Sequence, residues 1–132
     1  MPYYAHIRQD ENGETFYQTV AEHLTGTAAL CREFAADFGA EADGDLMGLA
    51  HDLGKCTDAF QKRLLEGGPV VDHTTAGMLT CIKMKRPSAA ACVAGHHGGL
   101  LDVGNLRTDR AGEATLSGRF KKGVEAALLA PT

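Results

Sequence analysis

The feature that most restricts the fold is a series of apolar residues that recur every three or four positions over residues 18–39. The series comprises Val20, Leu24, Thr27, Cys31, Phe34 and Phe38, and Gly39 follows it. This spacing matches the 3.6-residue period of a helix with one buried face, and a glycine commonly ends such a helix. The sequence therefore predicts a first helix over residues 18–39 and a fold that covers its apolar face.

Similar patterns predict further helices, separated by glycine and proline. They span residues 43–55 with Leu46, Leu49 and Leu53 buried, a short helix from Asp58 past Leu64, residues 73–85, residues 89–97 and residues 118–129. Asp58, Asp72 and Ser88 are the predicted N-caps of the middle three, because their side-chain oxygens accept from free backbone N–H groups. The polar stretch 102–117 is predicted to be a loop. No segment has a convincing strand pattern, so the predicted fold class is all-α, a compact helical bundle.

Composition narrows the class of protein. The 132 residues are 44% hydrophobic and 23% charged, which is ordinary for one globular domain, predicted over residues 1–132. No apolar run approaches the roughly 20 residues of a membrane span, and the N-terminus does not resemble a secretory signal. The four cysteines form no C-x-x-C pair, so we expect reduced, mostly buried thiols in a cytoplasmic protein. The net charge of −4 argues against a broad basic surface for nucleic acid, although contact at a metal site remains compatible with it.

The stretch Gly48 to Lys55, GLAHDLGK, places a histidine and an aspartate side by side in an apolar helical segment. Burying imidazole and carboxylate groups costs several kcal/mol unless each finds a partner. His51 and Asp52 therefore either form a hydrogen-bonded pair or hold a metal ion.

The histidines as a set favour the metal. They are His6, His23, His51, His73, His96 and His97. Each one alone can be a surface or hydrogen-bonded residue, but imidazole is the commonest metal ligand and carboxylates commonly bridge ions. The chain has no phosphate-binding P-loop, nucleophile elbow or H-E-x-x-H motif. We therefore predict metal-assisted hydrolysis, with helices that converge on a shared ion site.

Four motifs in a fixed order carry a resemblance to a known family. They are a lone histidine in the first helix (His23), HDLGK (51–55), DHTTAG (72–77) and GHHGGL (95–100). This set resembles the HD phosphohydrolase superfamily. With YAH at 4–6 and FQKRL at 60–64, it is similar to the CRISPR-associated branch, the HD nuclease domain that accompanies the type I CRISPR helicase. The resemblance covers residues 4–102.

The resemblance implies an all-helical, metal-dependent nuclease for single-stranded DNA. Its implied ligands are His23 and His51 for a first ion, Asp52 as a bridge, and His73, His96 and His97 for a second ion. Asp52 and Lys55 are the implied catalytic residues, and Lys55 either reaches a phosphate oxygen or holds the carboxylate. The implied cofactors are one or two divalent ions of Mn, Ni, Co, Fe or Mg. The implied partners are single-stranded DNA, a fused or separate CRISPR helicase and its effector complex, without a membrane.

One family feature is missing from the sequence. The family completes its first ion with a later aspartate, and only Asp102 and Asp109 follow the histidine pair, neither in a matching context. We therefore expect an N-terminal part of the domain, without its C-terminal helices, that retains the second ion best. Two alternatives are a small-nucleotide phosphohydrolase and an inactive HD module that serves as an interaction surface. His6 is expected to have a structural or supporting role.

Overall fold

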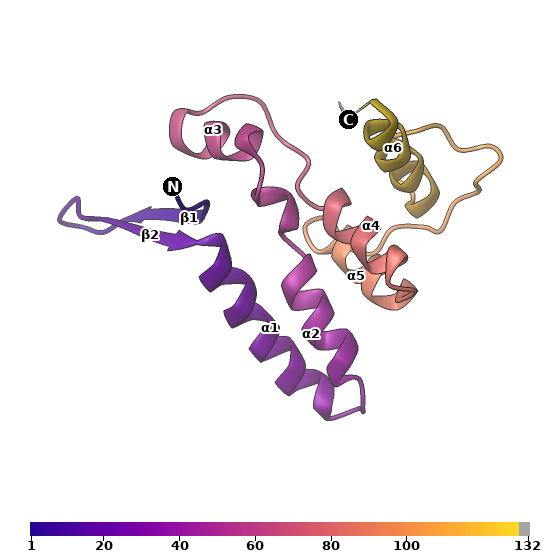
Figure 1. Cartoon of the computed structure of the whole chain (residues 1–132), viewed down its shortest axis with the longest axis horizontal. Coiled ribbons are helices and arrows are strands. Elements are labelled where there is room, and N and C mark those ends of the chain that lie inside the picture. Colours follow the sequence, from indigo (N-terminus) through magenta and orange to yellow (C-terminus); the bar gives the residue numbers. More distant parts are fainter. Residues whose placement is uncertain (130–132) are drawn as a thin grey trace.

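The computed structural model describes residues 1–129, with side chains described as far as residue 123 (Figure 1). The elements are β1 (Tyr4–Gln9), β2 (Thr15–Thr19), α1 (Val20–Ala36), α2 (Glu41–Ala50), the 3₁₀ turn η1 (Leu53–Lys55), α3 (Asp58–Glu66), α4 (Thr75–Lys83), α5 (Pro87–Gly95) and α6 (Leu116–Leu129). The prediction of an all-α helical fold is confirmed, with one small sheet beside the helices. Among the described residues, no helix is both long and apolar enough to cross a membrane.

Helix α1 begins where a capping box satisfies its first backbone groups. The Thr19 hydroxyl accepts a hydrogen bond from the Glu22 N–H at 3.1 Å, and the Glu22 carboxylate accepts from the Thr19 N–H at 2.9 Å. These reciprocal bonds replace two that the first turn cannot make within the helix. The helix therefore starts at Val20, two residues after its predicted start. It stops before Gly39, which adopts a φ of 73° that favours glycine.

Helices α1 and α2 run antiparallel and pack closely, as Figure 1 shows. Two glycines of α2 permit this approach. A Cβ atom on Gly44 would lie 2.5 Å from the Cys31 carbonyl oxygen, and one on Gly48 would overlap the backbone of Ala28. Because the helices are antiparallel, the start of α1 lies beside the end of α2, which is where the HD motif begins.

The main hydrophobic core lies between α2, α4 and α5. It consists of Ala50, Met78, Cys81, Ala89, Ala90, Val93 and Ala94, with Leu46, Leu53 and Phe120 among the partly buried side chains packed against it. A smaller cluster of Ala5, Val20 and Leu24 contacts Leu53 from the hairpin side. Leu53 touches both clusters, so the turn η1 sits at their junction.

The prediction that the chain has no strands is wrong, because β1 and β2 form a hairpin. β1 and β2 pair antiparallel in register from His6 opposite Gln18 to Gln9 opposite Thr15. Most of the hairpin's side chains are exposed or half-buried, so the sequence shows no alternation of apolar and polar residues. The hairpin is instead anchored to α3, where the Gln61 amide bonds the Tyr4 N–H and carbonyl at 2.9 Å each.

Several predicted helix boundaries also shift. Helix α2 stops at Ala50 rather than continuing to residue 55. Thr57, not Asp58, caps α3, and its hydroxyl accepts from the Phe60 N–H at 3.2 Å. Pro87 opens α5 rather than closing the preceding helix, because its missing N–H suits a first turn. Ser88 is therefore inside α5 and does not cap it.

Two more of the predicted helices start elsewhere in the structure. Helix α4 starts at Thr75 instead of residue 73, although Asp72 does accept bonds from its first N–H groups. Helix α6 starts at Leu116, two residues before its predicted start. Its predicted end at Pro131-Thr132 lies outside the described residues.

Part of the predicted apolar stripe is on the surface. Phe34 and Phe38 are 65% and 75% exposed, and Leu49 is exposed too. These side chains point away from the α1–α2 contact, which uses small residues in place of large ones. The cysteine prediction is only partly confirmed, because Cys81 is buried while Cys56 and Cys92 are exposed.

The close contact of α1 and α2 predicts the stability of a glycine variant. Gly48→Ala should lower the free energy of unfolding by about 2 kcal/mol, because overpacking against a backbone forces the helices apart. Gly26→Ala is the matched control, since a Cβ there meets nothing within 4 Å. It should be stabilising by up to about 1 kcal/mol through helix propensity. Urea unfolding of both variants in EDTA tests this, and equal stability of the two would contradict the packing argument.

Candidate metal centre

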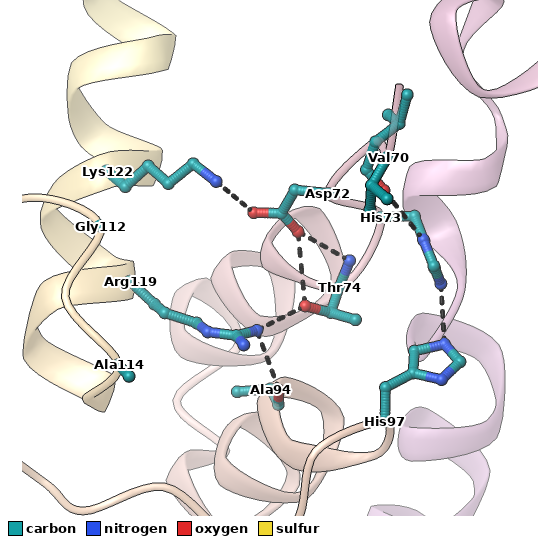
Figure 2. A pocket seen from close by; sticks show the side chains of 11 residues that line it. Val70, Asp72, His73, Thr74, Ala94, His97, Gly112, Ala114, Arg119 and Lys122 are labelled. Atoms are coloured by element: carbon teal, nitrogen blue, oxygen red, sulfur yellow. Dashed lines mark hydrogen bonds and ion pairs between the residues drawn. The ribbon is translucent and has the colours of Figure 1, made fainter. Parts of the chain in front are cut away.

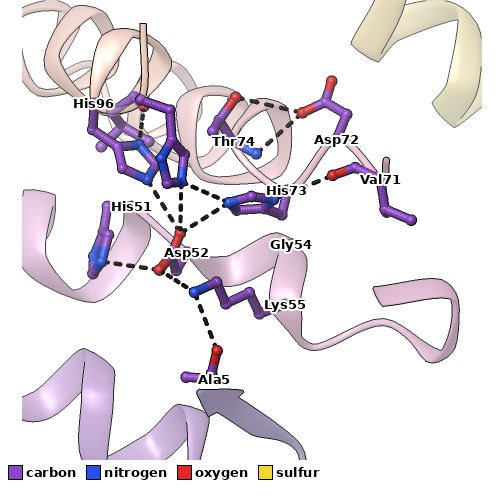
Figure 3. A network of polar contacts seen from close by, with 12 residues as sticks. Ala5, His51, Asp52, Gly54, Lys55, Val71, Asp72, His73, Thr74 and His96 are labelled. Atoms are coloured by element: carbon purple, nitrogen blue, oxygen red, sulfur yellow. Dashed lines mark hydrogen bonds and ion pairs between the residues drawn. The ribbon is translucent and has the colours of Figure 1, made fainter. Parts of the chain in front are cut away.

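The centre is organised around the Asp52 carboxylate, which lies between α2 and η1 and is only 3% exposed. Five imidazoles surround it, and Figure 3 shows several of them. The Nε2 atoms of His23 and His51 lie 2.9 and 3.2 Å from Oδ2, and those of His96, His73 and His97 lie 3.2, 3.5 and 3.9 Å from Oδ1. The structure therefore brings together all six residues predicted as ligands.

These side chains come from four separate places in the chain. His23 lies in the first turns of α1, and His51 directly follows α2. His73 precedes α4, and His96 and His97 follow α5. Four of the five imidazoles thus stand at helix ends rather than within helices, which differs from the predicted helix ranges. The chain turns at these ends, so side chains from different elements can face one point.

Hydrogen bonds to the backbone set the orientation of three rings. The Nδ1–H groups of His51 and His96 donate to the carbonyls of Gly48 and Val93 at 2.8 and 2.7 Å. The Nδ1–H group of His73 donates to a third carbonyl, that of Val71, at 3.2 Å. A neutral imidazole with its proton on Nδ1 carries its lone pair on Nε2. In the neutral form, these three rings direct the Nε2 lone pair to the Asp52 side, where a metal ion would take the place of the proton that otherwise lets Nε2 donate to the carboxylate.

Two pairs of ring nitrogens lie within hydrogen-bond distance of each other. The Nε2 atoms of His23 and His51 are 3.0 Å apart, and those of His73 and His97 are 2.8 Å apart. Such lone pairs repel unless a proton or a cation lies between them. Adjacent ligands at about 2.1 Å from one octahedral ion would lie about 3.0 Å from each other, which agrees with these separations. The arrangement fits divalent cations.

The ligand atoms fall into two groups that share Asp52. One group is Asp52, His73, His96 and His97, and the other is His6, His23 and Asp52, with all atoms of a group within 4.8 Å of one another. The first group matches the set implied for the second ion. The second group adds His6 to the predicted residues, and His51 lies against it through His23.

The comparison with protein families decides the family. The HD domain matches residues 20–119, a span that includes all four motifs from His23 to His97. The chain belongs to the HD domain family. Comparison with curated proteins gave no match. HD domains are generally metal-dependent hydrolases, and the histidine cluster around Asp52 fits that chemistry.

Lys55 of this HD domain is buried and contacts the shared carboxylate. Its Nζ lies 3.0 Å from Asp52 Oδ2, donates to the Ala5 carbonyl at 3.4 Å and lies 3.5 Å from His6 Nε2. The ammonium also lies 5.5 Å from the centre of the Phe60 ring. Lys55 thus supplies positive charge on the Oδ2 side, while the first ligand group lies on the Oδ1 side.

The charges of the HD domain centre follow from burial and hydrogen bonding. Burial by itself raises the pKa of Asp52, but hydrogen bonds from His51, His96 and Lys55 outweigh it and hold that pKa far below its usual value. The hydrogen bond to Asp52 raises the pKa of His96, whereas burial lowers the pKa of His23. Asp52 therefore stays anionic, and the raised pKa of His96 lets protons compete with a metal at that ring.

Gly54 was not singled out from the sequence, although it lies inside the HDLGK motif. Its N–H donates to the His73 carbonyl at 3.2 Å, and a Cβ atom there would overlap the His73 backbone. The turn η1 and the segment before α4 therefore meet without a side chain between them. The position of Gly54 between the candidate ligand Asp52 and Lys55 is the sequence feature that could have indicated this close contact.

His6 belongs to one of the two ligand groups, whereas two later aspartates lie outside both. His6 joins the cluster through the hairpin, whose formation the sequence did not reveal. Among the described residues, Asp102 and Asp109 take no part in either ligand group. Asp102 pairs with Thr115 in an isolated bridge, and Asp109 accepts from the Thr115 hydroxyl at 2.6 Å.

The shared position of Asp52 predicts the result of its removal. Asp52→Ala should weaken Mn²⁺ binding by more than about 100-fold, because it removes the one carboxylate that both ligand groups share. Asp58→Ala, which removes a carboxylate on α3 outside both groups, is the control. Elemental analysis of ions per chain after dialysis measures the effect. Equal metal content in the two variants would contradict the assignment of Asp52 as a shared ligand.

Proposed function

We propose that this HD domain is a divalent-metal phosphodiesterase that cleaves single-stranded DNA, in the CRISPR-associated branch of the superfamily. The observation that carries the proposal is the convergence of five imidazoles on the buried carboxylate of Asp52, in two ligand groups that share it. The motif order from His23 to GHHGGL supports the branch. The proposed partners are the type I CRISPR helicase, fused or separate, and its effector complex in the cytoplasm.

The residues of the centre have two proposed roles, which are to bind ions and to orient the groups that bind them. Asp52, His73, His96 and His97 would hold one divalent ion, and Asp52 with His23 and His51 would hold another, with His6 nearby. Bound divalent ions supply Lewis-acid chemistry, which activates water and stabilises negative charge on a phosphate. Lys55 fixes the orientation of Asp52 and adds a positive charge beside it. The backbone bonds of His51, His73 and His96 keep their Nε2 atoms directed at the Asp52 carboxylate.

Access to the centre favours an extended substrate. The side chain of His97 is exposed, and His73 and His97 line an open cavity of about 510 Å³. A single strand exposes its phosphates and needs no base pair to be opened before it reaches such a site. The net charge of −4 limits non-specific attraction of DNA, so delivery of the strand by a helicase suits this chain.

Substrate comparison tests the proposal. With Mn²⁺ added, the protein should cleave a single-stranded DNA oligonucleotide faster than it releases phosphate from nucleoside mono- or triphosphates. Faster hydrolysis of the small nucleotides would instead assign a nucleotide phosphohydrolase. Metal-loaded protein that hydrolyses none of these substrates would indicate an inactive HD module.

The position of Lys55 predicts a variant that separates binding from turnover. Lys55→Ala should retain metal, because the ligand atoms remain, but should lower kcat by about 10- to 100-fold through loss of carboxylate orientation. Lys62→Ala, which removes an exposed α3 lysine outside the centre, is the control. Elemental analysis and nuclease rates on the same preparations measure both quantities. Loss of metal from Lys55→Ala would overturn this role.

A further inference from the structure

A cavity beside the metal centre is bounded on its far side by two cations of α6. The same cavity of about 510 Å³ is lined by His73 and His97 and by Arg119 and Lys122. Figure 2 shows Arg119 and Lys122 reaching from α6 toward Asp72 and Thr74, with the two histidines beyond. Its volume lies within the range of about 300–1,000 Å³ common for small-molecule sites. A ligand in this cavity would lie next to the metal centre.

Arg119 is held in place with donors to spare. Its Nη1 group donates to the Thr74 hydroxyl at 2.7 Å and to the Ala94 carbonyl at 3.1 Å. These bonds fix the guanidinium between the start of α4 and the end of α5. A guanidinium has five N–H donors, and its planar fork matches the oxygens of a phosphate. Two donors are used here, so Arg119 can also bind an anion without reorganisation.

Lys122 can bind an anion without breaking the cap of α4. Its side chain is 52% exposed, and its Nζ lies 2.9 Å from Asp72 Oδ2. Asp72 also accepts from the N–H groups of Thr74 and Thr75, and from the Thr75 hydroxyl at 2.6 Å. The carboxylate therefore keeps its other partners when the ammonium shares its three donors with a ligand.

The charge of the cavity favours an anion. Arg119 and Lys122 outnumber the one carboxylate, Asp72, among the charged residues that line it. Such a surplus, with one cation fixed and one adaptable, is the chemistry that recognises a phosphate. The side chains at the opposite wall, His73 and His97, belong to the proposed reaction centre.

We propose that Arg119 and Lys122 form a second phosphate site, which binds a phosphate of the strand adjacent to the one that is cleaved. This inference rests on the proposed function and specifies its substrate class, a strand with at least two phosphodiesters. A substrate with a single phosphate would occupy the metal centre alone. The second site would therefore select polynucleotides through binding energy away from the reacting phosphate.

Binding of a labelled strand tests the site without requiring cleavage. The probe is a fluorescein-labelled deoxythymidine decamer, measured by anisotropy in Ca²⁺, with its intact length verified on a denaturing gel. Lys122→Gln should raise Kd about three- to tenfold and lower the slope of log Kd against log salt by about 0.7, the value for one lost phosphate contact. Lys122→Arg should restore affinity, since it keeps the charge.

Lys121→Gln is the matched control, because it removes the same charge one residue away. The Lys121 ammonium donates to the Asp109 carbonyl rather than lining the cavity. Its Kd should stay close to that of the wild type. Equal effects of Lys121→Gln and Lys122→Gln, or a wild-type protein that does not bind the decamer, would overturn the second site.

Kinetics separate this inference from the proposed function. With Mn²⁺, Lys122→Gln should lower the ratio of kcat/KM for the decamer to that for bis(4-nitrophenyl) phosphate, which has one phosphate, by about three- to tenfold. Cleavage with an unchanged ratio would contradict the second phosphate site but would still support the proposed nuclease activity. If Lys122→Gln specifically weakens decamer binding but the wild type cleaves nothing, the second phosphate site would be supported and the proposed nuclease activity would be contradicted.

Discussion

The burial of one carboxylate, that of Asp52, is the constraint on which the rest of the structure depends. An anion at 3% exposure is costly unless neighbouring groups compensate it, and here Lys55 and five imidazoles do so. Those groups come from α1, the end of α2, η1, the start of α4 and the end of α5. The elements that form the core are therefore the same ones that carry the ligands. A change that displaces one of these elements would therefore disturb both the core and the centre.

The close helix contacts have a direct role in the chemistry. Gly44 and Gly48 bring α2 against α1, so His23 and His51 meet, and Gly54 brings η1 against His73. Small residues at these positions let the backbones approach closely enough to place the ligand atoms within a few tenths of an ångström of where metal ligation requires them. Phe34 of α1 and Phe38, which follows α1, contribute little to this contact because they lie on the surface. Backbone proximity, rather than bulky packing, positions the candidate ligands.

Much of the fold and of the candidate centre could be predicted from the sequence, for identifiable reasons. The helical period of α1 and the motif order from His23 to GHHGGL are local patterns, and each survives in the structure. The hairpin lacked a readable signal because its side chains are mostly exposed and its anchor, Gln61, lies far along the chain. His6 was undervalued for the same reason, since its approach to Asp52 depends on that hairpin. Arg119 and Lys122 carry no motif in the sequence, because their place beside the centre depends on the packing of α6 against α4.

The bonds from His51 and His96 to the carbonyls three residues earlier link the end of each helix to the orientation of its imidazole ring. Each ring closes the last turn of its helix, at a point where helices ordinarily fray, and each helix in turn aims its ring. A one-residue insertion or deletion just before either histidine would therefore unravel a helix terminus and misdirect a ligand together. We therefore expect few insertions or deletions between the last turn of each helix and its histidine.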